Sequence, residues 1–236
     1  METSADRLAS TPRLDLYAFV HKGLRAFMSA TLSAVGRMDP DDEADRAAAM
    51  SQLRELLTTC ADHLAHENEF VHTAMETKRP GTAARAAADH VGHLREIAAL
   101  SASIDEFESA AGPARAAAAQ RLYRQLALFV AENFEHMNVE ETAHNAVLWA
   151  AYSDQQLAEL HDALVASIPP PALAGIMRWI IPSVSHPERV IVLSDIRRNA
   201  PAEAFAGMMA LARAHLSERD WDKLTRALEV GTAAAA

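Results

Sequence analysis

The sequence predicts an all-α protein, an up-down-up-down four-helix bundle with additional C-terminal helices. Alanine is abundant and only 8 glycines occur in 236 residues, a composition that favours helix over strand. Apolar residues recur at alternating steps of three and four, the period of an amphipathic helix. Turn residues divide the first part of the chain into four long stretches with short connections, which is typical of an up-down bundle.

Each of the four long helices is bounded by turn residues. Thr11-Pro12 places proline at the first position of a helix, where its missing N–H is not needed. A loop over 38–42 precedes an acidic helix start, Lys78–Gly81 closes the second helix, and Ala111-Gly112-Pro113 separates the third from the fourth. The helices are expected over residues 12–37, 43–77, 81–109 and 113–151.

The remainder of the chain predicts shorter helices. Ser153 and Gln156 form the pattern of a capping box, and prolines at 169–171, 182, 187 and 201 interrupt the helical pattern. The short helices are expected over 153–167, 172–181, 187–198, 202–215 and 218–229. We therefore expect two domains, the bundle over 12–151 and a C-terminal extension over 152–230 that packs on it. This extension could cover one end of the bundle, form the face of a homodimer, or act as a lid or partner-recognition module.

Composition limits the class of protein. The net charge of −10 and the pI of about 5.5 argue against nucleic acid or an anionic membrane as the main partner. Cys60 is the single cysteine, which excludes an intramolecular disulfide and fits a reducing compartment. The sequence shows no signal peptide at its start, and the apolar stretch 169–184 is too short to span a bilayer. A cytoplasmic protein is expected.

Histidine and glutamate interrupt the apolar stripe of every long helix. Burying an unpaired carboxylate or imidazole in such a position is costly, so a common explanation is required. At about 1.5 Å per residue, all of these side chains fall within one layer of the bundle, about 9 Å thick. They are His21 on the first helix, His63 and Glu67 on the second, His90 and His93 on the third, and His136 and Glu140 on the fourth.

These residue types suit a metal site. Neutral imidazole is a good ligand for iron and other first-row metals, and a carboxylate can bridge two cations. Five histidines and two glutamates are too many for one metal with an open position. The set therefore predicts a dinuclear, carboxylate-bridged site.

The pattern resembles that of hemerythrin and its bacterial relatives. It has a lone histidine on helix 1 (His21), His-x-x-x-Glu on helix 2 (His63 to Glu67), histidine on helix 3, and His-x-x-x-Glu on helix 4 (His136 to Glu140). The resemblance covers residues from about 14 to 151. Four such motifs in this order on successive helices make it specific, although each motif alone is weak.

The resemblance implies two non-haem iron ions. His21 and His63 would bind one iron, His90, His93 and His136 the other, and Glu67 and Glu140 would bridge them. The oxygen-carrying members of the family space the helix-3 histidines by four residues, whereas this chain spaces them by three, so one of His90 and His93 could lie behind the ligands. Those members also place the helix-4 carboxylate five residues after its histidine, which here is Glu141, but Glu140 shares the helix face of His136 better.

Other residues near these motifs are not expected to bind metal. His72 and His144 lie outside the stripes and are expected to be exposed, and Glu141 is expected to be a solvated charge. Cys60 is expected to be a small buried apolar group. Tyr17 is interpreted as a core residue in preference to a partner for an iron-bound ligand.

The expected function is the binding of O₂, NO or peroxide at an open iron position, for sensing, scavenging or detoxification. No dedicated acid or base is evident in the stripes, so an enzyme is not predicted, although a weak peroxidase-like activity is compatible with the site. Two alternatives remain. One is an iron-responsive regulatory or interaction module, and the other is an iron-handling or nitrosative-repair protein.

Overall fold

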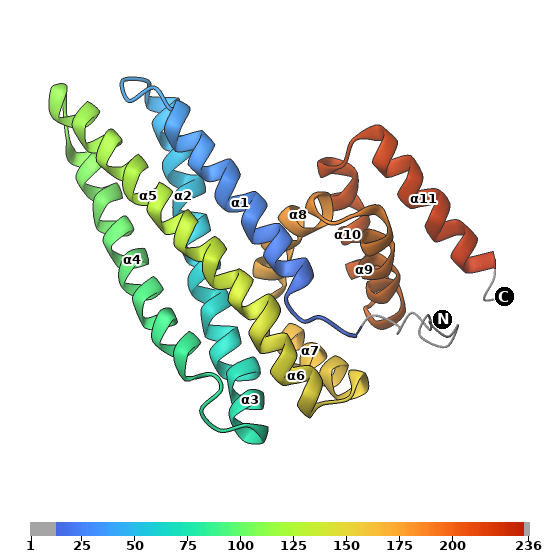
Figure 1. Ribbon diagram of the computed structural model, residues 1–236. Coiled ribbons are helices and arrows are strands. Elements are labelled where there is room, and N and C mark those ends of the chain that lie inside the picture. The colour runs from blue at the N-terminus through green and yellow to red at the C-terminus, as the bar shows by residue number, and fades with distance from the viewer. Residues whose placement is uncertain (1–12, 234–236) are drawn as a thin grey trace, which may run out of the picture.

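The computed structural model describes residues 13–233, and within this range the chain forms helices and no strand. The all-α prediction is confirmed for these residues. Four long helices lie side by side in Figure 1, and each contacts two of the others, so that α1 and α4 both pack against α2 and α5. They are α1 (Ala18–Arg37), α2 (Glu43–His66), α4 (Ala84–Ser109) and α5 (Pro113–Val139).

A continuous apolar core fills the space between these four helices. Leu53, Leu100, Ile104 and Leu126, which belong to the predicted stripes, are fully buried in it, and residues outside those stripes, such as Phe27 and Met50, also contribute. Burial of a side chain of this size contributes about 1.5–3 kcal/mol. The stripes that carry the metal-type residues are therefore also the stripes that hold the helices together.

Two of the long helices continue through π-helical turns that the sequence did not predict. After α2 the chain forms η1 (Glu67–His72) and then α3 (Thr73–Lys78). After α5 it forms η2 (Glu140–His144) and then α6 (Asn145–Ala151). A π turn bonds residue i to i+5 and so takes up one more residue than an α turn.

The extra residue shifts the buried stripe. On the second long helix, alternating steps of three and four after Glu67 predict Phe70 in the stripe, but Val71 is the buried residue. On the fourth, the same steps after Glu140 predict Ala143 and Val147, but His144 and Leu148 are the buried residues. The expected stripes are thus wrong by one residue beyond each π turn.

The chain enters the first long helix later than predicted. Pro12 lies outside the described residues, and α1 begins at Ala18. Asp15 accepts the backbone N–H groups of Tyr17 and Ala18 through Oδ1, at 2.9 and 3.1 Å. Arg13 donates to Asp154 Oδ1 at 2.6 Å, which holds this segment against the start of the next region.

The C-terminal helices have an apolar core of their own, which includes Ile181, Leu193, Ala212 and Leu224. The capping box of Ser153 and Gln156 is present as predicted. The helix that contains Pro182 ends one residue later, at Ser183. The helices are α7 (Asp154–Ser167), α8 (Pro170–Ser183), α9 (His186–Asn199), α10 (Ala202–His215) and α11 (Glu218–Ala233).

Helix α8 packs tightly against α1. Gly23 makes this approach possible, because a Cβ atom there would lie 2.7 Å from Ile180 Cγ1. The rings of Phe27 and Trp179 stack with their centroids 4.4 Å apart. One residue before Gly23, Lys22 Nζ lies 2.6 Å from Glu188 Oε1 on α9. The first long helix therefore links the bundle to the C-terminal helices.

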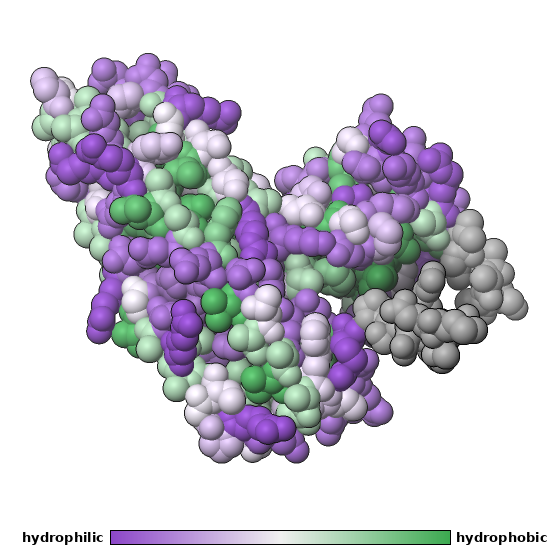
Figure 2. Space-filling model, viewed as in Figure 1, coloured by the Kyte–Doolittle hydropathy of each residue, from purple (hydrophilic) through white to green (hydrophobic). Residues whose placement is uncertain are grey.

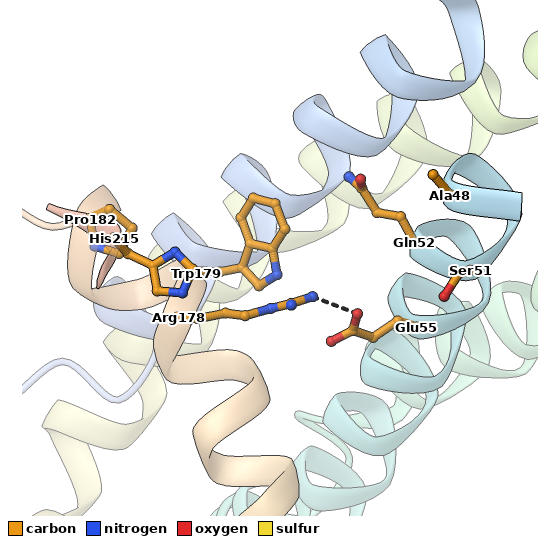
Figure 3. Close-up of a pocket in the computed structure, with 8 residues that line it drawn as sticks. All are labelled: Ala48, Ser51, Gln52, Glu55, Arg178, Trp179, Pro182 and His215. Atoms are coloured by element: carbon orange, nitrogen blue, oxygen red, sulfur yellow. Dashed lines mark hydrogen bonds and ion pairs between the residues drawn. The ribbon is translucent and has the colours of Figure 1, made fainter. Parts of the chain in front are cut away.

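A cavity of about 360 Å³ lies between α2 and this C-terminal region. Figure 3 shows Arg178 of α8 pointing toward α2, where its guanidinium pairs with the Glu55 carboxylate at 2.5 Å. None of the histidines or glutamates of the predicted metal site lines this cavity.

The surface in Figure 2 is mostly hydrophilic, with small apolar patches scattered over the long helices. Within the described residues, no single helix has the length and apolar composition needed to cross a membrane. Helices α7 and α8 meet those two criteria only when taken together, and they are bent by 118° relative to each other.

Candidate metal centre

Six of the seven predicted metal ligands converge inside the four long helices. They form two groups of four side chains, and within each group one ligand atom per side chain lies within 4.8 Å of all the others. The first group is His21, His63, Glu67 and Glu140, and the second is Glu67, His90, His136 and Glu140. Both glutamates belong to both groups.

The Glu67 carboxylate lies between the two groups. Its Oε1 atom is 3.1 Å from His63 Nε2 and 3.7 Å from His21 Nε2. Its Oε2 atom is 3.5 Å from His90 Nε2. One oxygen therefore faces each group.

The Glu140 carboxylate also faces both groups, with one oxygen toward each. Its Oε1 atom lies 3.2 Å from His136 Nε2 and 3.5 Å from His90 Nε2. Its Oε2 atom lies 3.6 Å from His21 Nε2. The two carboxylates together can bridge two cations, one in each group.

Six of these buried polar atoms lack hydrogen-bond partners. All four carboxylate oxygens of Glu67 and Glu140 are unpartnered, as are the Nε2 atoms of His21 and His63. Buried polar groups in folded proteins are almost always satisfied. A metal ion bound at about 2.0–2.2 Å would place its ligand atoms about 3.0–3.6 Å from one another, close to the distances observed here. The arrangement of these residues thus fits a metal ion placed among them.

Neighbouring side chains orient the histidines. Glu141 Oε1 lies 3.1 Å from Nδ1 of His21, and Arg25 holds the Glu141 carboxylate at 2.5 Å. Asn68 Oδ1 lies 2.9 Å from Nδ1 of His90. Contacts to Nδ1 leave Nε2 of each ring facing the glutamates, and metal-binding histidines in proteins are oriented by such contacts to the other ring nitrogen.

The structure distinguishes the roles of Glu140 and Glu141. Glu140 is fully buried in both groups, whereas Glu141 lies behind His21 and pairs with Arg25. The expectation that Glu141 is a solvated charge is wrong. Sequence reasoning also missed Asn68, whose position next to Glu67 was the available signal.

His93 lies beside the second group and outside it. Its ring centroid is 4.8 Å from that of His136, and its Nε2 atom is buried without a partner. It does not belong to either group of convergent ligand atoms. On the helix that carries both histidines, His90 is the one placed between the two carboxylates.

His72 and His144 are buried, and the expectation that both are exposed is wrong. Only 5% of His72 and 4% of His144 is accessible, and the two rings form a third group with Glu140. Each is the last residue of a π turn, and the extra residue in that turn rotates it inward. The Tyr17 hydroxyl lies 3.1 Å from Nδ1 of His144.

The charge states of these groups follow from burial and from one another. Burial lowers the pKa of His72 to about 4. For His21, burial acts in the same direction, but the contacts with Glu141 and Glu67 outweigh it and raise the pKa to about 9. Burial raises the pKa of Glu67, but His63 and His21 outweigh that effect and hold it well below its usual range. The carboxylate is therefore anionic and suited to bind a cation.

No family model, curated protein or solved structure matches the chain. The interpretation of the site therefore rests on its own geometry.

Proposed function

We propose that the chain is a hemerythrin-like protein that holds two iron ions and binds O₂, NO or peroxide, for sensing, scavenging or detoxification. The observation that carries this proposal is the position of two buried, unpartnered carboxylates between two pairs of histidines. Four imidazoles and two bridging carboxylates form a donor set suited to iron.

The proposal includes an up-down-up-down arrangement of α1, α2, α4 and α5. His21 and His90 lie near the starts of their helices, whereas His63 and His136 lie near the ends of theirs. Convergence of these four side chains is expected if neighbouring helices run in opposite directions. The core of the four helices supports this arrangement as well, since all four contribute to it.

Held by these residues, two iron ions would supply redox-active coordination positions for a small molecule. The chain's own residues hold the ions, orient the imidazoles and exclude water. Leu24, Cys60 and Phe129 are among the buried apolar residues of the same helices, each with 2% exposure or less. A dry surrounding strengthens the electrostatic interactions of whatever is bound within it.

Substitution of His63 and Glu67 by leucine tests the proposal. The wild-type protein is expected to retain about two iron ions per chain, and the His63→Leu/Glu67→Leu protein none, because two ligands are removed. Its helicity is expected to stay the same, because both positions then become apolar members of their stripe. The matched control is His66→Leu/Glu69→Leu on the same segment, where neither residue belongs to a convergent group. Metal analysis and circular dichroism measure iron content and helicity. Stoichiometric iron in the doubly substituted protein would contradict the assignment.

A regulatory module is the second candidate. The observation in its favour is that His21 of the metal centre is followed by Lys22, which pairs with Glu188 of α9, and by Gly23, which packs on α8. A shift of His21 on iron binding would therefore reach the C-terminal helices. Limited proteolysis of residues 153–236, with and without iron, tests this. Unchanged cleavage would contradict it.

A further inference from the structure

His72 and His144 form a pair of buried imidazoles that the proposed dinuclear site does not use. Both ring nitrogens of His72 are buried without a hydrogen-bond partner. The rings of His72 and His144 meet edge to face with centroids 5.5 Å apart, and each offers a nitrogen to the group that they share with Glu140. A buried imidazole without partners is unfavourable unless something else occupies the position it faces.

This histidine pair lies directly against the proposed metal ligands. The ring of His72 stacks on that of His90, with centroids 4.8 Å apart and planes inclined by 26°. Tyr17, which contacts Nδ1 of His144, also packs on His21 with ring centroids 5.2 Å apart. The pair and its neighbour Tyr17 therefore border one ligand of each proposed metal position: His72 contacts His90, and Tyr17 contacts His21.

The charge of the proposed centre indicates what belongs there. This step rests on the proposed function. Two divalent ions carry a charge of +4, the two bridging carboxylates carry −2, and neutral imidazoles add nothing. Glu141 does not neutralise the remaining positive charge, because its carboxylate already pairs with Arg25. An uncompensated buried charge is unfavourable, so an anion is required close to the ions.

A third cation would not suit the histidine pair. Its only carboxylate is Glu140, which both other groups share, and another divalent ion would double the excess positive charge. Neutral imidazoles can serve an anion instead, since each has one N–H to donate. For His144, donation by the Tyr17 hydroxyl to Nδ1 places the ring hydrogen on Nε2.

We propose that His72 and His144 donate hydrogen bonds to a small anion bound at the metal centre, and that Tyr17 orients His144 for this purpose. The class of ligand is a small anion that accepts two hydrogen bonds, such as azide, nitrite or hydroperoxide. Such a site discriminates in favour of anions over neutral diatomic molecules, because a hydrogen bond to a charged acceptor is the stronger one. Tyr17 is a positioning residue.

Azide titration of the iron-loaded protein tests the inference. Azide is the probe, and absorption spectroscopy or calorimetry measures its dissociation constant. His72→Leu and His144→Leu are each expected to raise this constant about tenfold or more, the usual effect of losing a hydrogen bond to a charged group. Iron is expected to stay at about two ions per chain, and NO affinity is expected to change by less than about threefold.

Two further variants separate hydrogen bonding from structure. His72→Gln keeps an N–H donor at the same position and is expected to recover most of the azide affinity lost in His72→Leu. His161→Leu is the matched control, because its side chain is 48% exposed on α7 and belongs to none of the convergent groups.

Several results would overturn the inference. Unchanged azide affinity in both leucine variants would exclude the hydrogen bonds, and loss of iron from either would make that histidine a ligand. Three irons per wild-type chain, reduced to two by His72→Leu, would make the pair a metal site. In those cases the dinuclear site itself stands. A wild-type protein that cannot hold two irons would overturn the proposed function and this inference together.

Discussion

The four long helices and the C-terminal helices differ in whether their buried charged side chains have hydrogen-bond partners. In the C-terminal region Arg189 is buried, but its guanidinium donates to the carbonyl oxygens of Ile181 and Val184 at 2.7 and 3.0 Å. In the bundle, Glu67 and Glu140 are equally buried, yet none of their oxygens has a hydrogen-bond partner. The first charge is satisfied by hydrogen bonds within the chain, whereas the two carboxylates face histidine nitrogens without hydrogen bonds, an arrangement that a metal ion between them could complete. A buried charge therefore indicates a ligand only when its partners are missing.

Removal of metal is expected to have the largest effect on the stability of the protein, because the proposed ligands hold the four long helices together. A ligand at about 1,000 times its dissociation constant stabilises the folded state by about 4 kcal/mol. Chelation of the wild-type protein should lower its melting temperature accordingly, as measured by scanning calorimetry. The His63→Leu/Glu67→Leu protein should melt at the same temperature with and without chelator. A chelator effect of equal size in both proteins would remove the contrast between the regions.

Arg189→Leu tests the buried charge of the C-terminal helices. It leaves two buried carbonyl groups without their donor and is expected to cost about 2–4 kcal/mol of unfolding free energy. Because Arg189 contacts no residue of the metal centre in this structure, iron content should not change. Denaturant unfolding and metal analysis measure the two quantities. Loss of iron together with stability would mean that the C-terminal helices hold the centre in place.

Glu141→Gln should weaken metal binding without abolishing it. Glu141 contacts Nδ1 of His21 from behind, and loss of such a contact typically lowers metal affinity about 10–100-fold. Competition with a chromogenic chelator measures the change. Glu135→Gln on the same long helix is the control, because Glu135 is exposed. Equal affinities in both variants would show that Glu141 does not orient His21.

Cys60 is expected to be unreactive in the folded protein. Burial raises the pKa of its thiol to about 12, so at pH 8 almost no thiolate is present. Alkylation by iodoacetamide, followed by mass spectrometry, should proceed only after denaturant is added. Fast modification of the folded protein at pH 8 would show that the core around the centre opens readily.

The sequence predicted most of the helices and the convergence of six side chains, because both depend on the α-helical period. His63 with Glu67, and His136 with Glu140, are four residues apart, and in each pair the glutamate is the first residue of the π turn, so the α-helical spacing still holds up to it and the shared face follows from the sequence. Proline and capping residues predicted the C-terminal helices, and α10 has the predicted bounds.

The wrong predictions beyond Glu67 and Glu140 follow from the two π turns, which the spacing of apolar residues does not reveal. A π turn begins at each of Glu67 and Glu140 and moves every later side chain by one position, which brings His72 and His144 inside. The late start of α1 has a different cause. Arg13 and Leu14 bond to Asp154, a contact between residues far apart in sequence.

The most direct test of the account is metal analysis of protein purified without oxygen, together with its absorption spectrum after exposure to air. The account predicts about two irons per chain and the appearance of charge-transfer absorption from a bridged iron pair, with both lost in His63→Leu/Glu67→Leu. One tightly held iron per chain, or none in protein supplied with ferrous iron, would contradict it.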